Sequence, residues 1–273
     1  MTHIKVLTIN LLNDLSRWDE RKNLIAQGVN DLQPDLIALQ EVKLPLNTAQ
    51  WLADELNVCR DDTAGRLYKT YLCPKSGRGK DHEGIAILSR LPVEGEATLD
   101  LKGQGRVAHY IRLKIEDKRL IFANTHLYWE PGESKERMKQ VERLLEWLRT
   151  TPADAVVVCG DFNGEPDHLA IKRMRKQFDS AHFAFHNAEP AYTCPTPLTS
   201  KRNLIEGTAR SVRQAFLNLK TNHIMHWRGT LDYIFVNECV KVKACDVVLN
   251  KAAPHDSTLY PSDHVGLIAE LIL

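Results

Sequence analysis

Short runs of consecutive apolar residues alternate along the chain with longer segments in which apolar residues recur every three or four positions. Consecutive apolar runs are typical of strands buried on both faces, whereas the longer spacing is typical of helices that bury one face. The short runs predict strands at residues 4–9, 36–39, 85–88, 107–115, 120–125, 155–159, 231–236, 242–249 and 265–272. The longer segments predict helices at residues 17–32, 48–56, 134–149 and 167–178, with Ser134 as a cap for the third.

Strands interleaved with helices from end to end indicate a layered α/β or α+β fold. No Pro-, Gly- or Ser-rich linker divides the sequence, so we expect residues 1–273 to form a single domain. A hydrophobic content of 43% and a charged content of 26% are ordinary for a soluble globular protein.

The formal net charge of +1 excludes attraction of polyanions to the whole surface, so any such binding must use local patches. Residues 66–80 hold five Lys or Arg and no acid, and residues 198–228 hold six against one Glu. Each segment is either a solvated face or a surface that binds phosphates.

The six cysteines include no CxxC pair, so neither a zinc motif nor a redox motif is indicated and a reducing compartment is favoured. The first residues lack the features of a secretion signal, and no apolar stretch is long enough to span a bilayer. We therefore expect a cytoplasmic protein without membrane insertion.

Polar side chains stand at the ends of the predicted strands, where the backbone is fixed and the side chain stays accessible. Alone, each such residue also fits a turn, a helix cap or a structural histidine. Together, their carboxylates and carboxamides suit Mg²⁺ or Mn²⁺, and the absence of Cys among them disfavours zinc. With imidazoles to handle a proton, the set indicates phosphoester hydrolysis. Its members are Asn10, Glu41, His126, Asp161, Asn163, Asp232, Asp263 and His264.

Six motifs fall in order along almost the whole chain: LQEV (39–42), EGIAILSR (83–90), NTHL (124–127), GDFN (160–163), LDYIFV (231–236) and SDH (262–264). In this order they resemble the endonuclease/exonuclease/phosphatase superfamily. The resemblance implies a four-layer α/β/β/α sandwich, in which two mixed sheets face each other and helices lie outside. It also implies hydrolysis of phosphoesters with Mg²⁺ or Mn²⁺.

The same resemblance implies a role for each matching residue. Glu41 would be the principal metal ligand, with Asn10 close by and Asp263 helping to hold the site. Asp161 and Asn163 would position or activate the nucleophilic water and hold the phosphate. His126 and His264 would contact the scissile phosphate, with His264 oriented by Asp232 and His126 oriented by Glu83. The number of metal ions and the identity of the base stay open.

Within the superfamily, ANTHLYWEPGESKERMKQV, LTINLLND and WRGTLDYIF are most similar to the branch of deadenylases, nocturnin and 2′,5′-phosphodiesterases. That likeness implies that Trp227 and Pro131 sandwich a nucleobase, although Trp227 also fits a half-buried core aromatic. Arg106 is either a further substrate-binding residue or an ordinary surface charge. Residues 196–228 form a longer and more basic insertion than this branch carries, and EGIAILSR is closer to bacterial sphingomyelinases.

The leading hypothesis is a metal-dependent phosphodiesterase that acts on nucleic acid or an oligonucleotide, with RNA favoured and cleavage from a 3′ end. A phospholipid or inositol-phosphate hydrolase would share the same metal site. A non-catalytic nucleic-acid-binding module is the third possibility, which the complete motif set argues against. An abasic-site endonuclease is disfavoured, because His126 stands where that branch has Tyr.

Overall fold

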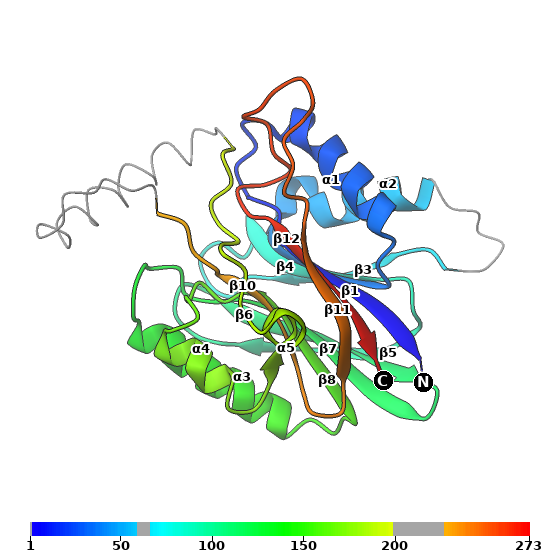
Figure 1. Cartoon of the computed structure of the whole chain (residues 1–273), viewed down its shortest axis with the longest axis vertical. Helices are drawn as coiled ribbons and strands as arrows, with labels where there is room; N and C mark the ends of the chain where they lie inside the picture. Colours follow the sequence, from blue (N-terminus) through cyan, green and yellow to red (C-terminus); the bar gives the residue numbers. More distant parts are fainter. Residues whose placement is uncertain (1, 59–65, 199–226) are drawn as a thin grey trace, which may run out of the picture.

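The structure, a computed structural model, describes residues 2–58, 66–198 and 227–273. Two six-stranded sheets face each other, and helices cover their outer sides (Figure 1). The first sheet has the strand order β11-β12-β1-β2-β4-β3, and the second has the order β5-β6-β7-β8-β10-β9. The predicted four-layer sandwich of two mixed sheets is thereby confirmed.

The first sheet combines the beginning, the middle and the end of the described chain. β1 pairs in parallel with β2 and antiparallel with β12, so the sheet is mixed. Two helices, α1 (Trp18–Leu32) and α2 (Thr48–Val58), bury their apolar residues against its outer face, with a 3-10 turn at Leu44–Leu46 before α2. The strands are β1 (His3–Asn10), β2 (Leu36–Lys43), β3 (Lys69–Pro74), β4 (Glu83–Ser89), β11 (Lys241–Val248) and β12 (Gly266–Ile272).

The second sheet is built around the parallel pair β7 and β8. Helices α3 (Lys135–Arg149) and α4 (Leu169–Met174) lie on its outer side, opposite to α1 and α2 (Figure 1). A short helix, α5 (Ala181–His186), contacts β10 and β11. The strands are β5 (Val93–Asp100), β6 (Val107–Ile115), β7 (Lys118–His126), β8 (Ala155–Asp161), β9 (Asp179–Ser180) and β10 (Asp232–Val236).

Apolar side chains from both sheets form the central core. Val6 and Leu36 of the first sheet belong to the same buried cluster as Phe122 and Val157 of the second. The opposite faces of these strands pack on the helices, so seven of the eight residues of β2 are buried. Burial on both faces explains why these strands are consecutive apolar runs in the sequence. In the part of the chain that the structure describes, no helix is both long and apolar enough to cross a bilayer.

The nine strands predicted from apolar runs and three of the four helices are present at nearly the expected bounds. The prediction of a helix over 167–178 was too long, because α4 ends at Met174 and tight turns follow it. Strands β3, β5 and β9 and helix α5 were not predicted. β5 alternates half-buried and exposed positions without an apolar run, and β3 is a sheet edge within the basic segment 66–80. Most of the basic insertion 196–228 lies outside the described residues.

Gly160 allows β8 to lie close enough to β7 to bring the end of β8 into the sheet. Its φ is +145°, and a Cβ atom built there would lie 2.0 Å from the backbone oxygen of Thr125. The backbone carbonyl cannot yield to such an atom, so glycine is required at this position. Asp161 follows directly and pairs with His126 in the same ladder.

We expect Gly160→Ala to lower the free energy of unfolding by about 2–5 kcal/mol, because strain and overpacking combine. Gly77→Ala is the matched control: its φ is also positive, at +67°, but nothing lies within 4 Å of the added Cβ. That variant should lose about 1–2 kcal/mol from backbone strain alone. Urea unfolding followed by circular dichroism compares the two, and equal losses would contradict the steric explanation.

Candidate active site

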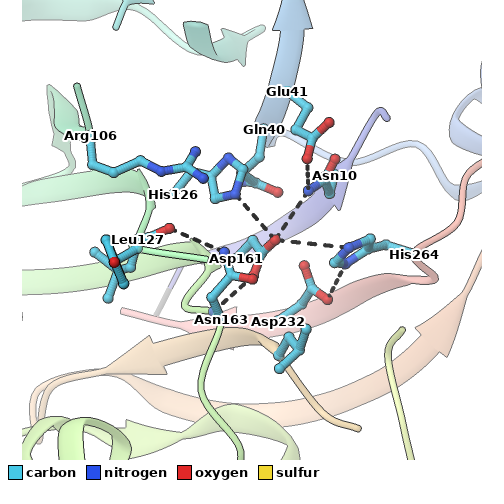
Figure 2. A network of polar contacts seen from close by, with 12 residues as sticks. Asn10, Gln40, Glu41, Arg106, His126, Leu127, Asp161, Asn163, Asp232 and His264 are labelled. Atoms are coloured by element: carbon cyan, nitrogen blue, oxygen red, sulfur yellow. Dashed lines mark hydrogen bonds and ion pairs between the residues drawn. The ribbon is translucent and has the colours of Figure 1, made fainter. Parts of the chain in front are cut away.

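The polar residues predicted at strand ends meet at one edge of the sandwich, around Asp161 (Figure 2). Asn10 ends β1 and Glu41 lies near the end of β2, both in the first sheet. His126 ends β7 and Asp161 ends β8, both in the second sheet. Because β1 runs parallel to β2 and β7 runs parallel to β8, each pair delivers its side chains to the same edge. The two sheets therefore each supply part of one constellation.

Glu41 is directed into the site by an irregularity in β2. Leu39 pairs with Ala86 and Val42 pairs with Gly84, so Gln40 and Glu41 interrupt the regular ladder. Glu41 has a φ of +53°, a strained conformation for a residue with a side chain. Its Oε2 accepts a hydrogen bond from the backbone N–H of Asn13 at 2.9 Å, and its Oε1 lies 3.5 Å from Asn10 Nδ2. Such bulges commonly re-aim side chains at functional sites.

Asp161 is the meeting point of the constellation. Its Oδ2 accepts a hydrogen bond from Asn10 Nδ2 at 3.1 Å and lies 3.5 Å from His126 Nε2 and 3.8 Å from His264 Nε2. Its Oδ1 accepts from the backbone N–H of Asn163 at 2.9 Å. Asn163 adopts a φ of +50° and donates from Nδ2 to the backbone oxygen of Leu127 at 3.1 Å. The turn after β8 thus holds the side chains of Asp161 and Asn163 in place.

His264 and Asp232 form a buried pair with a 2.8 Å contact between Nδ1 and Oδ2. Burial by itself lowers the pKa of His264, but the charge and hydrogen bond of Asp232 outweigh burial and hold that pKa well above its ordinary value. Ser262 fixes the preceding turn, since its Oγ donates to the backbone oxygen of Asn10 at 2.6 Å. The arrangement holds the ring with Nε2 toward Asp161 (Figure 2).

His126 has a different environment. Burial, reinforced by the charge of Arg106, keeps its pKa well below the ordinary value, which favours a neutral imidazole. Glu83 lies 3.9 Å from His126 Nδ1, but the same carboxylate binds Lys75 Nζ at 2.6 Å and Asn13 Nδ2 at 3.0 Å. Arg106 is almost buried and approaches Glu83 at 3.5 Å. The Glu83 carboxylate therefore lies near four polar side chains, those of Asn13, Lys75, Arg106 and His126, rather than near His126 alone.

The donor set fits a hard divalent cation. Burial, with the neighbouring charge of Asp232, raises the pKa of Asp161 to about 7, so the charge of His264 does not fully offset the cost of ionising this carboxylate. Among the described residues, Asp232 Oδ1 is also buried without a hydrogen-bond partner. Carboxylate and carboxamide oxygens are the ligands that Mg²⁺ and Mn²⁺ prefer. Glu41 and Asp161, bridged by Asn10, are the carboxylates best placed to share such an ion.

The remaining predicted residues lie around this centre. Asp263 is half-buried and lies beside His264 and Cys194. Trp227 is partly exposed; its Nε1 donates to Glu165 Oε1 at 3.3 Å, just after the GDFN turn. Pro131 is exposed in the loop after β7. Cys194, which was not among the residues predicted for the site, is buried beside His264 in the fold.

Several residues of the site region were not predicted from the sequence. Asn13 links Glu41 to Glu83, and together with Asp14, Leu15, Lys43 and Glu83 it lines an open groove of about 500 Å³. Arg21, fully buried in α1, donates to the backbone oxygens of Leu11, Leu12, Asp14 and Pro261 and so joins the loop after β1 to the turn that carries His264. No sequence motif marks these contacts, since an arginine in a helix is usually solvent-exposed.

Arg137, in α3, organises the loop that carries Pro131. Its guanidinium is buried and donates to the backbone oxygens of Tyr128, Glu130 and Gly132. Gly164, next to Asn163, packs against the same side chain. Burial lowers the pKa of Arg137, with Asp161 the foremost charge opposing that shift. One buried cation thus fixes the loop after His126 and borders the GDFN turn.

We expect Arg137→Met to lower the free energy of unfolding by about 2–4 kcal/mol, because three partly buried carbonyl groups lose their donors. The amides of residues 127–133 should exchange with deuterium faster, as measured by hydrogen-exchange mass spectrometry. Arg149→Met in the same helix is the matched control, since Arg149 is exposed and pairs with Glu146 across one turn. It should change stability by less than about 0.5 kcal/mol. Unchanged exchange in Arg137→Met would contradict the organising role.

Residues 7–264 match the sequence profile of the Endonuclease/Exonuclease/phosphatase family. The chain therefore belongs to this family. It is 26% identical to human nocturnin over 269 residues, which cover 93% of this chain and 58% of nocturnin. It is 29% identical to human 2′,5′-phosphodiesterase 12 over 290 residues, which cover 93% of this chain and 46% of that protein. The chain thus spans about half the length of these curated relatives.

Solved structures share the fold. The human nocturnin catalytic domain with a bound sulfate anion matches with a TM-score of 0.72 and 24% identity, covering 99% of this chain and 93% of that one. TDP2 from D. rerio in complex with a single-strand DNA product matches with a TM-score of 0.73 and 14% identity over 100% of both chains. At these identities the likeness establishes the fold and leaves the activity to be argued from the site.

Proposed function

We propose that this chain is a phosphodiesterase that uses Mg²⁺ or Mn²⁺ to hydrolyse phosphodiester bonds in nucleic acid, with RNA or an oligoribonucleotide as substrate and cleavage from the 3′ end. The observation that carries this proposal is the convergence of Glu41, Asn10, His126 and His264 on Asp161. Carboxylates, carboxamides and imidazoles gathered at one edge of the sandwich are the groups that phosphoryl transfer to water requires.

A bound cation would polarise a phosphoryl oxygen and offset the negative charge that develops on it. Glu41 is the proposed principal ligand, and Asn10 holds the Glu41 and Asp161 carboxylates at a fixed separation. His264, whose Nδ1 is held by Asp232, presents Nε2 toward the phosphate. Neutral His126 contributes a donor from the opposite side of Asp161. Asp161 and Asn163 position the attacking water.

Three observations support nucleic acid as the substrate. The relatives include a protein named 2′,5′-phosphodiesterase 12, and the fold is shared by a protein solved with single-strand DNA. Trp227 is partly exposed and anchored at Glu165, two residues beyond Asn163. Pro131 lies exposed in the loop that Arg137 holds next to the same turn. An indole and a proline near the phosphate site suit a stacked base.

The decisive experiment compares substrates in the presence of Mg²⁺. We expect hydrolysis of oligo(A) or of 2′,5′-linked oligoadenylate, loss of activity with a chelator, and recovery on adding Mg²⁺ or Mn²⁺. Sphingomyelin vesicles and an inositol polyphosphate are the comparison substrates. Turnover of either of these, with both oligonucleotides left intact, would overturn the nucleic-acid assignment and favour a lipid or inositol-phosphate hydrolase.

Glu41→Gln keeps the size of the side chain but removes its charge, so the affinity for the cation should fall. We expect kcat/KM to drop about 100-fold or more, with partial recovery at high Mn²⁺ concentration. Glu238→Gln, at an exposed position in the turn after β10, is the matched control and should retain wild-type activity. Full activity of Glu41→Gln would show that the catalytic centre lies elsewhere and would favour a binding module.

Trp227→Ala should raise KM for an oligonucleotide about 5- to 150-fold with a much smaller change in kcat, because one stacked base contributes roughly 1–3 kcal/mol. Trp227→Phe should recover most of the loss. Phe185→Ala, at an exposed aromatic residue on α5, is the control for removal of a surface ring. An unchanged KM in Trp227→Ala would assign the indole a structural role beside Glu165 and Gly229.

A further inference from the structure

Cys194 is brought to the catalytic His264 by a short extended segment that no sequence motif marks. Backbone hydrogen bonds clamp this segment on both sides: Val265 N donates to Thr193 O at 2.9 Å, and Thr196 N donates to Asp263 O at 2.7 Å. On its other edge, Cys194 exchanges two backbone hydrogen bonds with Gly229. The thiol therefore has a fixed position beside the turn that carries Asp263 and His264.

The side chains of this corner form a mixed set of metal ligands. Cys194 Sγ, a carboxylate oxygen of Asp263 and a ring nitrogen of His264 all lie within 4.8 Å of one another. Cys194 and His264 are buried, whereas Asp263 is half-buried and gives the corner access to solvent. Thiolate, imidazole and carboxylate together suit Zn²⁺ and similar ions, while Mg²⁺ and Mn²⁺ bind thiolate poorly.

His264 is oriented as a metal-ligating histidine is. Its Nδ1 lies 2.8 Å from Asp232 Oδ2, which leaves Nε2 for an ion. A carboxylate on the far nitrogen fixes the tautomer and strengthens the ring as a ligand. Tetrahedral Zn²⁺ would place its donor atoms about 3.3–3.8 Å apart, given bond lengths of about 2.0–2.3 Å. The present set, whose atoms lie within 4.8 Å, must therefore contract by at most about 1.0–1.5 Å, which half-buried Asp263 allows.

We propose that Cys194, Asp263 and His264 form a second metal site, selective for Zn²⁺ over Mg²⁺, whose occupation inhibits the enzyme. Binding forms bonds from zinc to Cys194 Sγ and His264 Nε2, and it releases the thiol proton and the Nε2 proton of His264 to solvent. The ion takes His264 Nε2, the atom that faces Asp161 at 3.8 Å. The imidazole of His264 is then no longer available to contact the scissile phosphate. The inhibitory consequence rests on the proposed function; the binding site itself does not.

Cobalt spectroscopy tests the binding site without reference to activity. The full chain, stripped of metal and kept reduced, is titrated with Co²⁺ in excess Mg²⁺, which saturates the hard-cation site. We expect a thiolate-to-cobalt charge-transfer band in the near ultraviolet and intense visible bands of a tetrahedral ion, saturating at one equivalent. Zn²⁺ should abolish these bands by displacing Co²⁺.

Cys194→Ser should lose the charge-transfer band, and Asp263→Asn should shift the Co²⁺ titration at least tenfold to higher concentration. Cys239→Ser, at an exposed cysteine in the turn after β10, is the matched control and should retain the band. Thermal melts establish that each variant is folded. The absence of a thiolate band in the wild type, or its persistence in folded Cys194→Ser, would overturn the site.

Inhibition is measured separately, as the Zn²⁺ concentration that halves hydrolysis of the oligonucleotide in excess Mg²⁺. We expect this concentration to rise at least tenfold in Cys194→Ser relative to Cys239→Ser. An unchanged value, with the cobalt band lost, would overturn the inhibitory role while leaving the site. If no oligonucleotide is hydrolysed at all, the proposed function fails, and the cobalt result still decides the site.

Discussion

The hydrogen bond from Asn10 Nδ2 to Asp161 Oδ2, at 3.1 Å, joins the end of β1 to the end of β8 and so connects the two sheets. Its length depends on how closely the sheets pack, which the apolar core between them sets. A hydrogen bond weakens steeply when its partners separate by more than a few tenths of an ångström. The packing of this apolar cluster therefore sets the distance between Asn10 and Asp161, although the cluster itself contributes no side chain to the site.

Much of the fold could be predicted from the sequence, because a strand that is buried on both faces consists of consecutive apolar residues, as in β2 and β8. β5 was not predicted because its half-buried and exposed positions alternate without an apolar run, and β3 was not predicted because it lies within the basic segment 66–80. The site residues were accessible because polar groups such as Asp161 followed these runs. The contacts between these side chains could not be predicted. The bulge at Glu41 and the backbone hydrogen bonds that hold Cys194 arise from pairing between segments that are distant in the sequence.

Two buried arginines hold loops beside the site in place, and this role could not be predicted from the sequence. Arg21 and Arg137 each gather backbone oxygens from loops that flank the site, one beside the first sheet and one beside the second. A guanidinium has several N–H donors, so it can hydrogen-bond the backbone oxygens of an irregular loop that no strand pairs with. It also leaves positive charge near a cluster of acids, although Asp161 still retains a raised pKa. Loop order and electrostatic balance are thus coupled through the same side chains.

The position of β12 between β11 and β1 has a consequence for biosynthesis. β1 is the first of the described strands to be synthesised, yet one of its two neighbours is the last of them, and His264 lies two residues before that strand. A nascent chain carrying Asn10, Glu41 and Asp161 would lack His264 and a completed first sheet. The constellation around Asp161 is therefore completed late, when β12 pairs with β1 and His264 reaches Asp232.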